Sequence, residues 1–250
     1  MKQINRLPRP VMAVLLVLAG LLMLLLPAGV AHLGDAELFS GTVPRPAMEG
    51  QLSGQAQEIP VVYALYRRRI LSGGEESLSD ARETSTAEQA LSMSGTVRAM
   101  ADAGILPQSC RNAAKAVFES PDAMAFTGQQ NGFIQKSYQG YDGPTGECRS
   151  ISIQQQEETG LVTACAVSAE MPDWQEEACT AEEILKSYRD YLGLGELTDW
   201  QTAGTAAGGE VGWSETGQIY LYCSFGEERF ALGAVSLSEE QLEIIADGFS

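Results

Sequence analysis

Residues 149–167 read RSISIQQQEETGLVTACAV, and they carry the clearest strand pattern in the chain. Arg149–Ile153 alternates polar and apolar side chains, and Leu161–Val167 is a mostly apolar run. Between them, Glu157–Gly160 has the composition of a turn. Two runs of this kind on either side of a turn predict a β-hairpin with one buried side.

The register of this hairpin determines which of its side chains are buried. If the turn is centred between residues 158 and 159, Ile151 faces Ala166 on the buried side. Cys165 then lies on the other side of the hairpin, several residues from Cys148. We therefore expect no disulfide between these cysteines, because a disulfide requires Cα atoms within about 7 Å.

A second hairpin is predicted near the C-terminus. Gln218–Ser224 and Arg229–Ser236 are the expected strands, joined by a turn at residues 226–227. Tyr220 and Tyr222 then lie on the side opposite the apolar residues, above small residues of the other strand. Such tyrosines form a shallow platform of the kind that interfaces favour. Alternation leaves a second arrangement open, in which another layer covers this side.

Capping signals and helical periodicity predict the helices. The capping-box pairs are Thr86 with Gln89, Thr180 with Glu183, and Ser238 with Gln241. Shorter helices are expected from Pro60 onward and around Cys110. Residues 204–212 are rich in glycine, but without a lysine or a following helix they are predicted to be a flexible loop and not a phosphate-binding loop.

These elements predict an α+β fold with an N-terminal transmembrane helix, a short helical segment, and an antiparallel sheet or sheets in two β-β-β-α-like units. A weak echo between Thr163–Ser168 and Ala231–Ser236 suggests a duplication. Two separate sheets with one helix each, or one continuous sheet backed by both helices, satisfy the pattern equally.

The N-terminal region contains an uncharged apolar run, Val11–Ala31, which is long enough to cross a bilayer. Lys2, Arg6 and Arg9 precede it, so the positive-inside rule places the N-terminus in the cytoplasm and the rest of the chain outside. The alternative is a signal peptide that is cleaved near Ala31, which would release a secreted protein.

The predicted domain organisation follows from these features. We expect a cytoplasmic tail at residues 1–9, a transmembrane anchor at 10–31, a flexible stalk at 32–59, a helical segment at 60–119 and an α+β extracytoplasmic domain at 132–250.

The exported part is strongly acidic. Three of the 16 basic residues precede the apolar run, whereas all 33 acidic residues follow it, so the exported part carries a formal charge of about −20. This charge disfavours nucleic acids as partners, because binding them requires Lys and Arg to neutralise phosphates. Its simplest role is to keep the domain soluble.

The chain has one histidine, His32, which lies at the predicted membrane edge. The folded part therefore lacks the base of Ser-His-Asp and Cys-His systems. The cysteines form no C-x-x-C pair, and they are Cys110, Cys148, Cys165, Cys179 and Cys223. We expect no catalytic, cofactor-binding or metal-binding residues, and the odd number of cysteines leaves at least one without an intramolecular disulfide.

Two sets of residues are candidates for binding a partner. One is the platform of Tyr220 and Tyr222, and the other is the basic triplet Arg67, Arg68 and Arg69. The triplet could bind an acidic partner or the bilayer, although a solvated helix face that pairs with the protein's own carboxylates is the expectation we favour.

The sequence thus favours a non-enzymatic, membrane-anchored extracytoplasmic domain that binds an envelope protein or another ligand. A carboxylate-dependent cell-wall hydrolase is a second hypothesis, which requires two distant acids to converge in a cleft. A third is a structural envelope component that forms oligomers through its odd cysteine.

Overall fold

The computed structural model describes residues 52–72, 82–83, 85–141, 148–169, 179–205, 209–226 and 229–248. Intramolecular contacts assign residues 50–250 to one compact unit. The predicted tail, anchor and most of the stalk lie outside the described residues. Within the described ranges, no helix is both long and apolar enough to cross a membrane.

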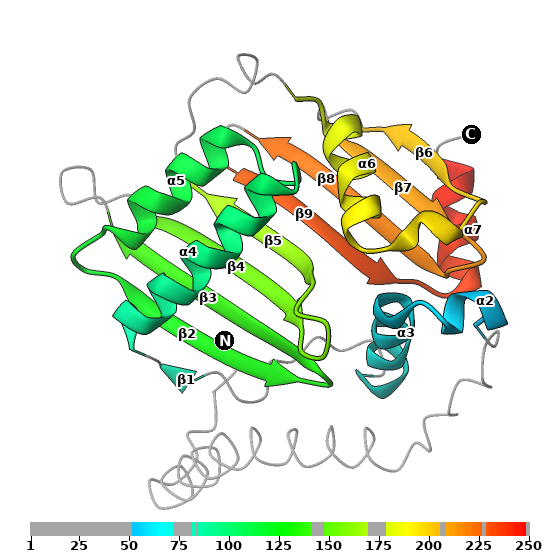
Figure 1. Cartoon of the computed structure of the whole chain (residues 1–250). Helices are drawn as coiled ribbons and strands as arrows, with labels where there is room; N and C mark the ends of the chain where they lie inside the picture. Colours follow the sequence, from blue (N-terminus) through cyan, green and yellow to red (C-terminus); the bar gives the residue numbers. More distant parts are fainter. Residues whose placement is uncertain are drawn as a thin grey trace, which may run out of the picture. The chain divides into compact units, whose positions relative to one another are not determined.

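The described strands form one antiparallel sheet in the order β1-β2-β3-β4-β5-β9-β8-β7-β6 (Figure 1). Their bounds are β1 Arg82–Glu83, β2 Met124–Gln130, β3 Phe133–Tyr141, β4 Cys148–Gln156, β5 Val162–Ser168, β6 Gln201–Gly204, β7 Glu210–Ser214, β8 Ile219–Gly226 and β9 Arg229–Ser236. The predicted α+β class is confirmed, and the sheet is continuous.

Helices cover both faces of the sheet. Their bounds are α2 Gly54–Gln57, α3 Pro60–Ser72, α4 Thr86–Asp102, α5 Gln108–Phe118, α6 Ala181–Tyr191, the 3-10 turn η2 Leu194–Glu196, and α7 Glu239–Gly248. Figure 1 shows α4, α5 and α6 in front of the sheet and α7 behind β6 and β7. The main core lies under the three front helices, and Leu242 of α7 packs against Val211 and Trp213 in a smaller cluster.

The sheet consists of two similar halves that meet at the antiparallel pair β5–β9. The N-terminal half contains α4, α5 and β2–β5, and the C-terminal half contains α6, β6–β9 and α7. In each half a helix precedes a four-stranded meander. The predicted order is confirmed in that a helix follows each run of strands, α6 after β5 and α7 after β9, but each run has four strands in place of the predicted three. The weak similarity between Thr163–Ser168 and Ala231–Ser236 does not match equivalent positions of the two halves either. It aligns Cys165 with Gly233, and these two residues lie on opposite faces of the sheet.

The predicted register of the first hairpin is wrong by one residue. Ile151 pairs with Val167 and Ile153 pairs with Cys165, because a register shift interrupts the ladder between Gln154 and Gln155. One extra residue in a β-bulge moves every later side chain to the other face. Cys165 therefore lies in the core with 2% of its surface exposed.

The second hairpin keeps its predicted faces, but its register differs from the prediction. Tyr222 pairs with Gly233 and Tyr220 with Val235, which in each case is two residues further along β9 than predicted. A shift of two residues along one strand leaves the two faces unchanged.

Two predicted capping boxes are present and one is not. The boxes at Thr180 and Ser238 form as expected. Gln89 instead turns into the protein, where its amide nitrogen donates to the carbonyl oxygens of Phe126 and Ser137 at 2.8 and 2.9 Å, and its oxygen accepts from Thr127. These hydrogen bonds join α4 to β2 and β3. Capping signals are local in the sequence, so they could not predict contacts between these separate elements.

Two segments that were expected to be irregular belong to the folded unit. Residues 52–59, placed in the stalk, contain α2 and the buried side chains of Leu52 and Ile59. The glycine-rich segment 204–212 runs from the end of β6 to the start of β7. A Cβ at Gly209 would lie 2.6 Å from the carbonyl oxygen of Cys223, so close strand packing explains this glycine.

Candidate functional site

The two tyrosines of the predicted platform lie under α7. Their ring centroids are 6.5 Å apart, and both rings pack against the cluster that contains Leu242. Tyr222 lies flat over Gly233, where any Cβ would collide with the phenol ring. The structure thus shows the covered arrangement, with both tyrosines half-buried. Partner binding by Tyr220 and Tyr222 stays a prediction for their exposed edges.

The basic triplet lies on α3. Arg67 lies over the ring of Tyr63 in the same helix, whereas Arg68 and Arg69 also contact residues outside it. Arg68 donates to the side-chain oxygen of Gln154 and stacks over Phe133, with 5.1 Å from its guanidinium to the ring centroid. Arg69 donates to the side-chain oxygen of Gln218 at 2.8 Å. The expectation that the triplet pairs with carboxylates is not met by these contacts, which run to amides and aromatic rings.

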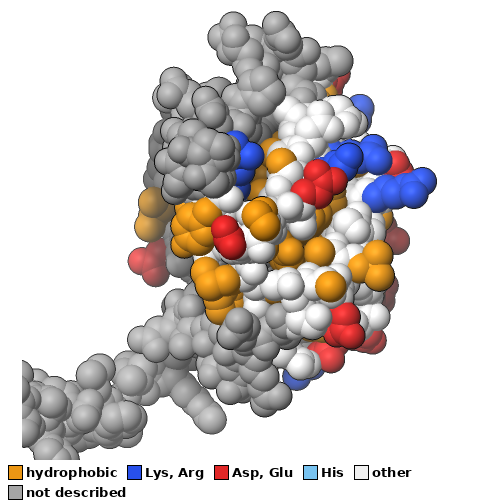
Figure 2. Space-filling view, turned by 90° about the vertical axis from the view of Figure 1, so that its left-hand side faces the viewer, with side chains coloured by type: hydrophobic (Ala, Val, Ile, Leu, Met, Phe, Trp, Pro, Cys, Tyr) orange, Lys and Arg blue, Asp and Glu red, His pale blue; other side chains and the backbone are white. Residues whose placement is uncertain are grey.

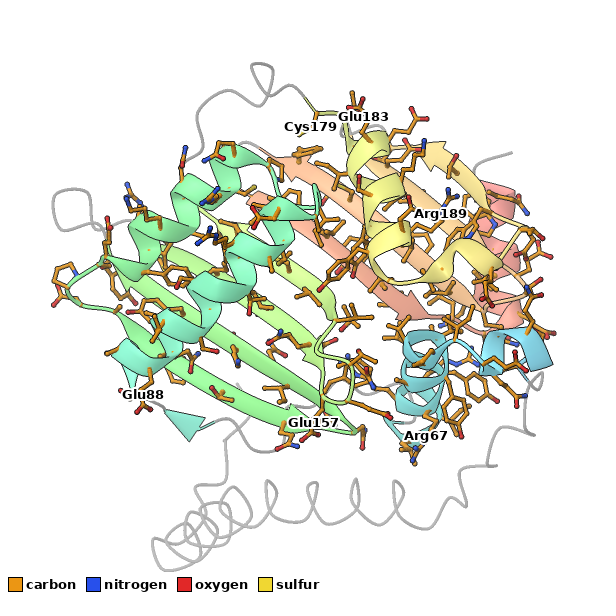
Figure 3. The ribbon with its side chains drawn as sticks, viewed as in Figure 1. Arg67, Glu88, Glu157, Cys179, Glu183 and Arg189 are labelled. Carbon is orange, nitrogen blue, oxygen red and sulfur yellow. The ribbon has the colours of Figure 1, made fainter. Side chains whose placement is uncertain are left out.

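Arg68 and Arg69 reach different halves of the sheet. Gln154 belongs to β4 of the N-terminal half, whereas Gln218 precedes β8 of the C-terminal half. The two arginines therefore bridge the halves through α3. Arg67 is the exposed member of the triplet, and Figure 3 shows it at the outer side of α3. Of the triplet, Arg67 is thus the residue with a side chain available to a partner.

On the face that Figure 2 shows, hydrophobic side chains are interspersed with charged and other side chains. Exposed apolar residues of the N-terminal half include Leu91, Met124 and Tyr141, from three different elements. Single exposed apolar side chains are normal on a soluble domain and define no interface by themselves.

A pocket lies between α6 and the outer strands of the C-terminal half. It has a volume of about 210 Å³, and its lining residues are Glu182, Leu185, Lys186, Arg189, Trp200, Thr202, Glu210, Gly212 and Leu221. In Figure 3 the labelled Arg189 lies on the side of α6 toward β6 and β7. We call this site the α6 pocket.

The amphipathic pattern of α6 positions one wall of the α6 pocket. Its capping box fixes the start of the helix, and Ile184 and Tyr188 are buried against the sheet. The hydroxyl of Tyr188 donates to the carbonyl oxygen of Val162 at 3.1 Å and fixes the helix on the sheet. Residues three and four apart share a helix face, so Glu182, Lys186 and Arg189 form one stripe along the flank of α6.

The floor of the pocket depends on a glycine and an aromatic ring. A Cβ at Gly212 would lie 3.3 Å from the Leu185 side chain, so the missing side chain lets α6 approach β7 closely. Trp200, in the segment between η2 and β6, lies beneath Arg189, with 5.9 Å from the guanidinium carbon to the ring centroid. A cation over an indole face is attracted by the ring quadrupole.

The charged groups of the α6 pocket do not form ion pairs with one another. None of Glu182, Lys186, Arg189 and Glu210 forms an ion pair with a described residue. The Nε of Arg189 is buried and has no hydrogen-bond acceptor among the described residues. Burial raises the pKa of Glu210 above its ordinary value, and the negative charge of Glu182 raises it further. The pocket thus presents unpaired groups of both signs.

Sequence reasoning did not find this site. The sequence analysis selected none of Glu182, Arg189 and Glu210 as a candidate site residue. The spacing of Glu182, Lys186 and Arg189 was a visible signal of one polar helix flank. The opposite wall could not be anticipated, because β7 was predicted to be a loop.

Comparison with known proteins gives no relative from which a role could be inferred. No protein-family model matches the sequence, and neither a curated protein nor a solved structure shows significant similarity to it.

Proposed function

We propose that this chain is a single-pass membrane protein whose extracytoplasmic α+β domain binds a ligand without transforming it, with the α6 pocket as the binding site. The apolar run Val11–Ala31 and the basic residues before it support the anchor and its orientation. Release by cleavage near Ala31 would export the same domain, and the experiment below separates the two.

The observation that carries the binding role is the set of unpaired charges around the α6 pocket. Partly desolvated charges usually have a partner, because burial without one costs free energy. Here Arg189 and Glu210 face the same pocket and neither forms an ion pair with a described residue. A ligand that supplies the missing charges would remove this cost on binding.

A non-enzymatic role is favoured by the residue types of the exported part. Its sequence has no histidine beyond His32, so no side chain with an ordinary pKa near neutrality is present to move protons. The thiol of Cys165 is an unsuitable nucleophile, because complete burial raises its pKa to about 12.

The location is tested by thiol labelling of intact cells. Cys148 is exposed, so a membrane-impermeant maleimide should label it from outside in a protein that fractionates with membranes. Because Cys179 is also partly exposed, the double variant Cys148→Ser/Cys179→Ser is the control and should lose the label. Labelling that requires cell lysis would contradict export, and a labelled protein found in the medium would show cleavage in place of anchoring.

The binding role is tested by native mass spectrometry of the full-length protein extracted from membranes. Wild-type protein should carry bound mass that the double variant Arg189→Met/Glu210→Gln loses. Arg98→Met is a matched control, since Arg98 lies on an exposed face of α4. Equal bound mass on both variants would contradict the α6 pocket as the binding site.

One observation also favours a cell-wall hydrolase as a second candidate. Glu182 and Glu210 share one pocket, and the raised pKa of Glu210 is a property of general acids. In that case Glu210→Gln should abolish release of soluble sugars from wall polysaccharide, whereas Arg98→Met should not. Release of soluble sugars that persists in both Glu182→Gln and Glu210→Gln would exclude the hydrolase candidate.

The structural-component alternative depends on the exposed Cys148 or the half-buried Cys179, since Cys110, Cys165 and Cys223 are buried. It predicts a disulfide-linked dimer on non-reducing electrophoresis that Cys148→Ser or Cys179→Ser removes. A monomer band from freshly isolated membranes would contradict it.

A further inference from the structure

The charge arrangement of the α6 pocket narrows the class of ligand. One acidic residue, Glu182, and two basic residues, Lys186 and Arg189, lie along one flank of α6, and Glu210 of β7 adds a second carboxylate. A ligand of one charge would satisfy one pair of groups and leave the other pair unpartnered. A ligand that carries both charges on neighbouring atoms satisfies both.

The basic side of the pocket suits a carboxylate. Arg189 lies over Trp200, and its Nε has no acceptor among the described residues. A guanidinium binds a carboxylate through two parallel hydrogen bonds, and Nε is one of the donors in that geometry. Lys186, one turn away on the same helix flank, adds a second positive charge.

The acidic side of the pocket suits an ammonium group. Glu182 and Glu210 both line the pocket, and the negative charge of Glu182 contributes to the raised pKa of Glu210. A cation between the two carboxylates relieves this repulsion and favours the ionised form of Glu210. An ammonium group also offers three N–H donors to the carboxylate oxygens.

The size and floor of the pocket limit the rest of the ligand. Its volume of about 210 Å³ lies below the range of about 300–1,000 Å³ that is typical of pockets for drug-sized ligands. Leu185, Trp200 and Leu221 provide an apolar surface between the charged groups. The site therefore accommodates a short apolar side chain and excludes an extended chain.

We infer that the α6 pocket binds a free α-amino acid with a small apolar side chain, its carboxylate on Arg189 and Lys186 and its ammonium between Glu182 and Glu210. This inference rests on the proposed function, since it identifies the ligand class of the same site.

The test is isothermal titration of the full-length protein in detergent with matched probes. L- and D-leucine, valine and alanine are compared with 3-methylbutylamine, which is leucine without its carboxylate, and with 4-methylpentanoate, which is leucine without its amine. At least one amino acid should bind, and both single-charge analogues should bind at least tenfold more weakly. Arg189→Met and Glu210→Gln should each weaken binding at least tenfold, and Arg98→Met should not.

Two outcomes would overturn the inference. Equal affinity for the amine and the amino acid would make the pocket a cation site, and no binding by any amino acid at millimolar concentration would exclude the class. Either result leaves the proposed function testable by itself, because bound mass on the native protein and surface labelling of Cys148 do not depend on the ligand class. Loss of those two signals, in contrast, would contradict the proposed function.

Discussion

The two halves of the sheet share a topology but use the helix-covered face differently. In the N-terminal half, Met93 and Met100 of α4 are fully buried, and the amide of Gln89 satisfies two carbonyl groups of the strands below it. In the C-terminal half, α6 buries Tyr188 but leaves a pocket lined by charged groups at its flank. The N-terminal half also has a pocket, beside α5, but it is smaller, at about 160 Å³, and Arg149 is the one charged residue among its described lining residues. The same arrangement thus seals α4 onto the sheet in one half and leaves a pocket with charges of both signs in the other.

The opposite faces differ as well. In the C-terminal half, α7 covers Trp213 and both tyrosines of β8. In the N-terminal half, this face carries uncharged polar side chains that bond to one another across strands, including Gln135 and Ser137, which both bond to Ser152. Cross-strand hydrogen bonds of this kind contribute to sheet stability without an apolar layer. Under the proposed function, the N-terminal half mainly stabilises the fold and the C-terminal half carries the binding site.

The largest expected effect tests whether the halves fold as one unit. Tyr188→Ala removes a fully buried aromatic ring of α6 and should lower the free energy of unfolding by about 3–5 kcal/mol. Because the core is continuous across β5 and β9, we expect one cooperative transition in urea. Leu91→Ala, at a side chain 77% exposed, is the control and should change stability by less than about 0.5 kcal/mol. Two separate transitions in Tyr188→Ala would show that the halves unfold independently.

The next largest effect concerns the hydrogen bonds that hold α4 against the sheet in the N-terminal half. Gln89→Ala leaves the carbonyl groups of Phe126 and Ser137 without this donor and should cost about 2–3 kcal/mol in urea unfolding. The matched control is Gln129→Ala, whose amide bonds to Glu157 at the surface and should contribute less than about 0.5 kcal/mol. Similar small losses in both variants would mean that Gln89 does not seal the helix against the sheet.

A smaller effect, dependent on pH, concerns the turn between β7 and β8. The carboxylate of Asp199 accepts from the Ser214 hydroxyl at 2.6 Å and from the Thr216 backbone N–H at 2.7 Å. Desolvation by burial acts to raise the pKa of Asp199, but these hydrogen bonds outweigh it and lower the pKa below its ordinary value.

A lowered pKa in the folded state stabilises the fold above the unfolded pKa of about 3.9, and this contribution is lost as pH falls through the folded value. Asp199→Asn should therefore cost about 1–2 kcal/mol at pH 7. The difference from wild type, measured by urea unfolding between pH 7 and 3, should shrink below about pH 4. A difference that is constant over this range would contradict the role of the carboxylate.

The sequence predicted most elements but not their combination. Helix α6 was correct in its start, its buried stripe and its end at Gly193, because capping and periodicity are local signals. The face of Cys165 was wrong because a bulge carries no sequence signature that could be recognised. The predicted role of Gln89 was wrong because the local sequence is the same for a capping glutamine and for a buried one. The strands that accept its hydrogen bonds are distant in the sequence.

The candidate site was less predictable than the fold. Its walls come from α6, from the segment around Trp200 and from β7, which are separate in the chain and meet in the tertiary structure. β7 itself is short and contains Gly212, so its pattern resembled a loop. The membrane anchor, in contrast, is a property of one continuous segment and stays a prediction from the sequence.

The most direct test of the account asks whether the charges of the α6 pocket stabilise the fold or are kept for a ligand. The measurement is the free energy of unfolding of Glu182→Gln/Glu210→Gln without ligand, with Asp102→Asn on the exposed face of α4 as control. If the carboxylates await a ligand, their removal relieves repulsion, and stability should be unchanged or rise by up to about 1 kcal/mol. A loss of more than about 1.5 kcal/mol would show that they stabilise the fold and would contradict the α6 pocket as a binding site.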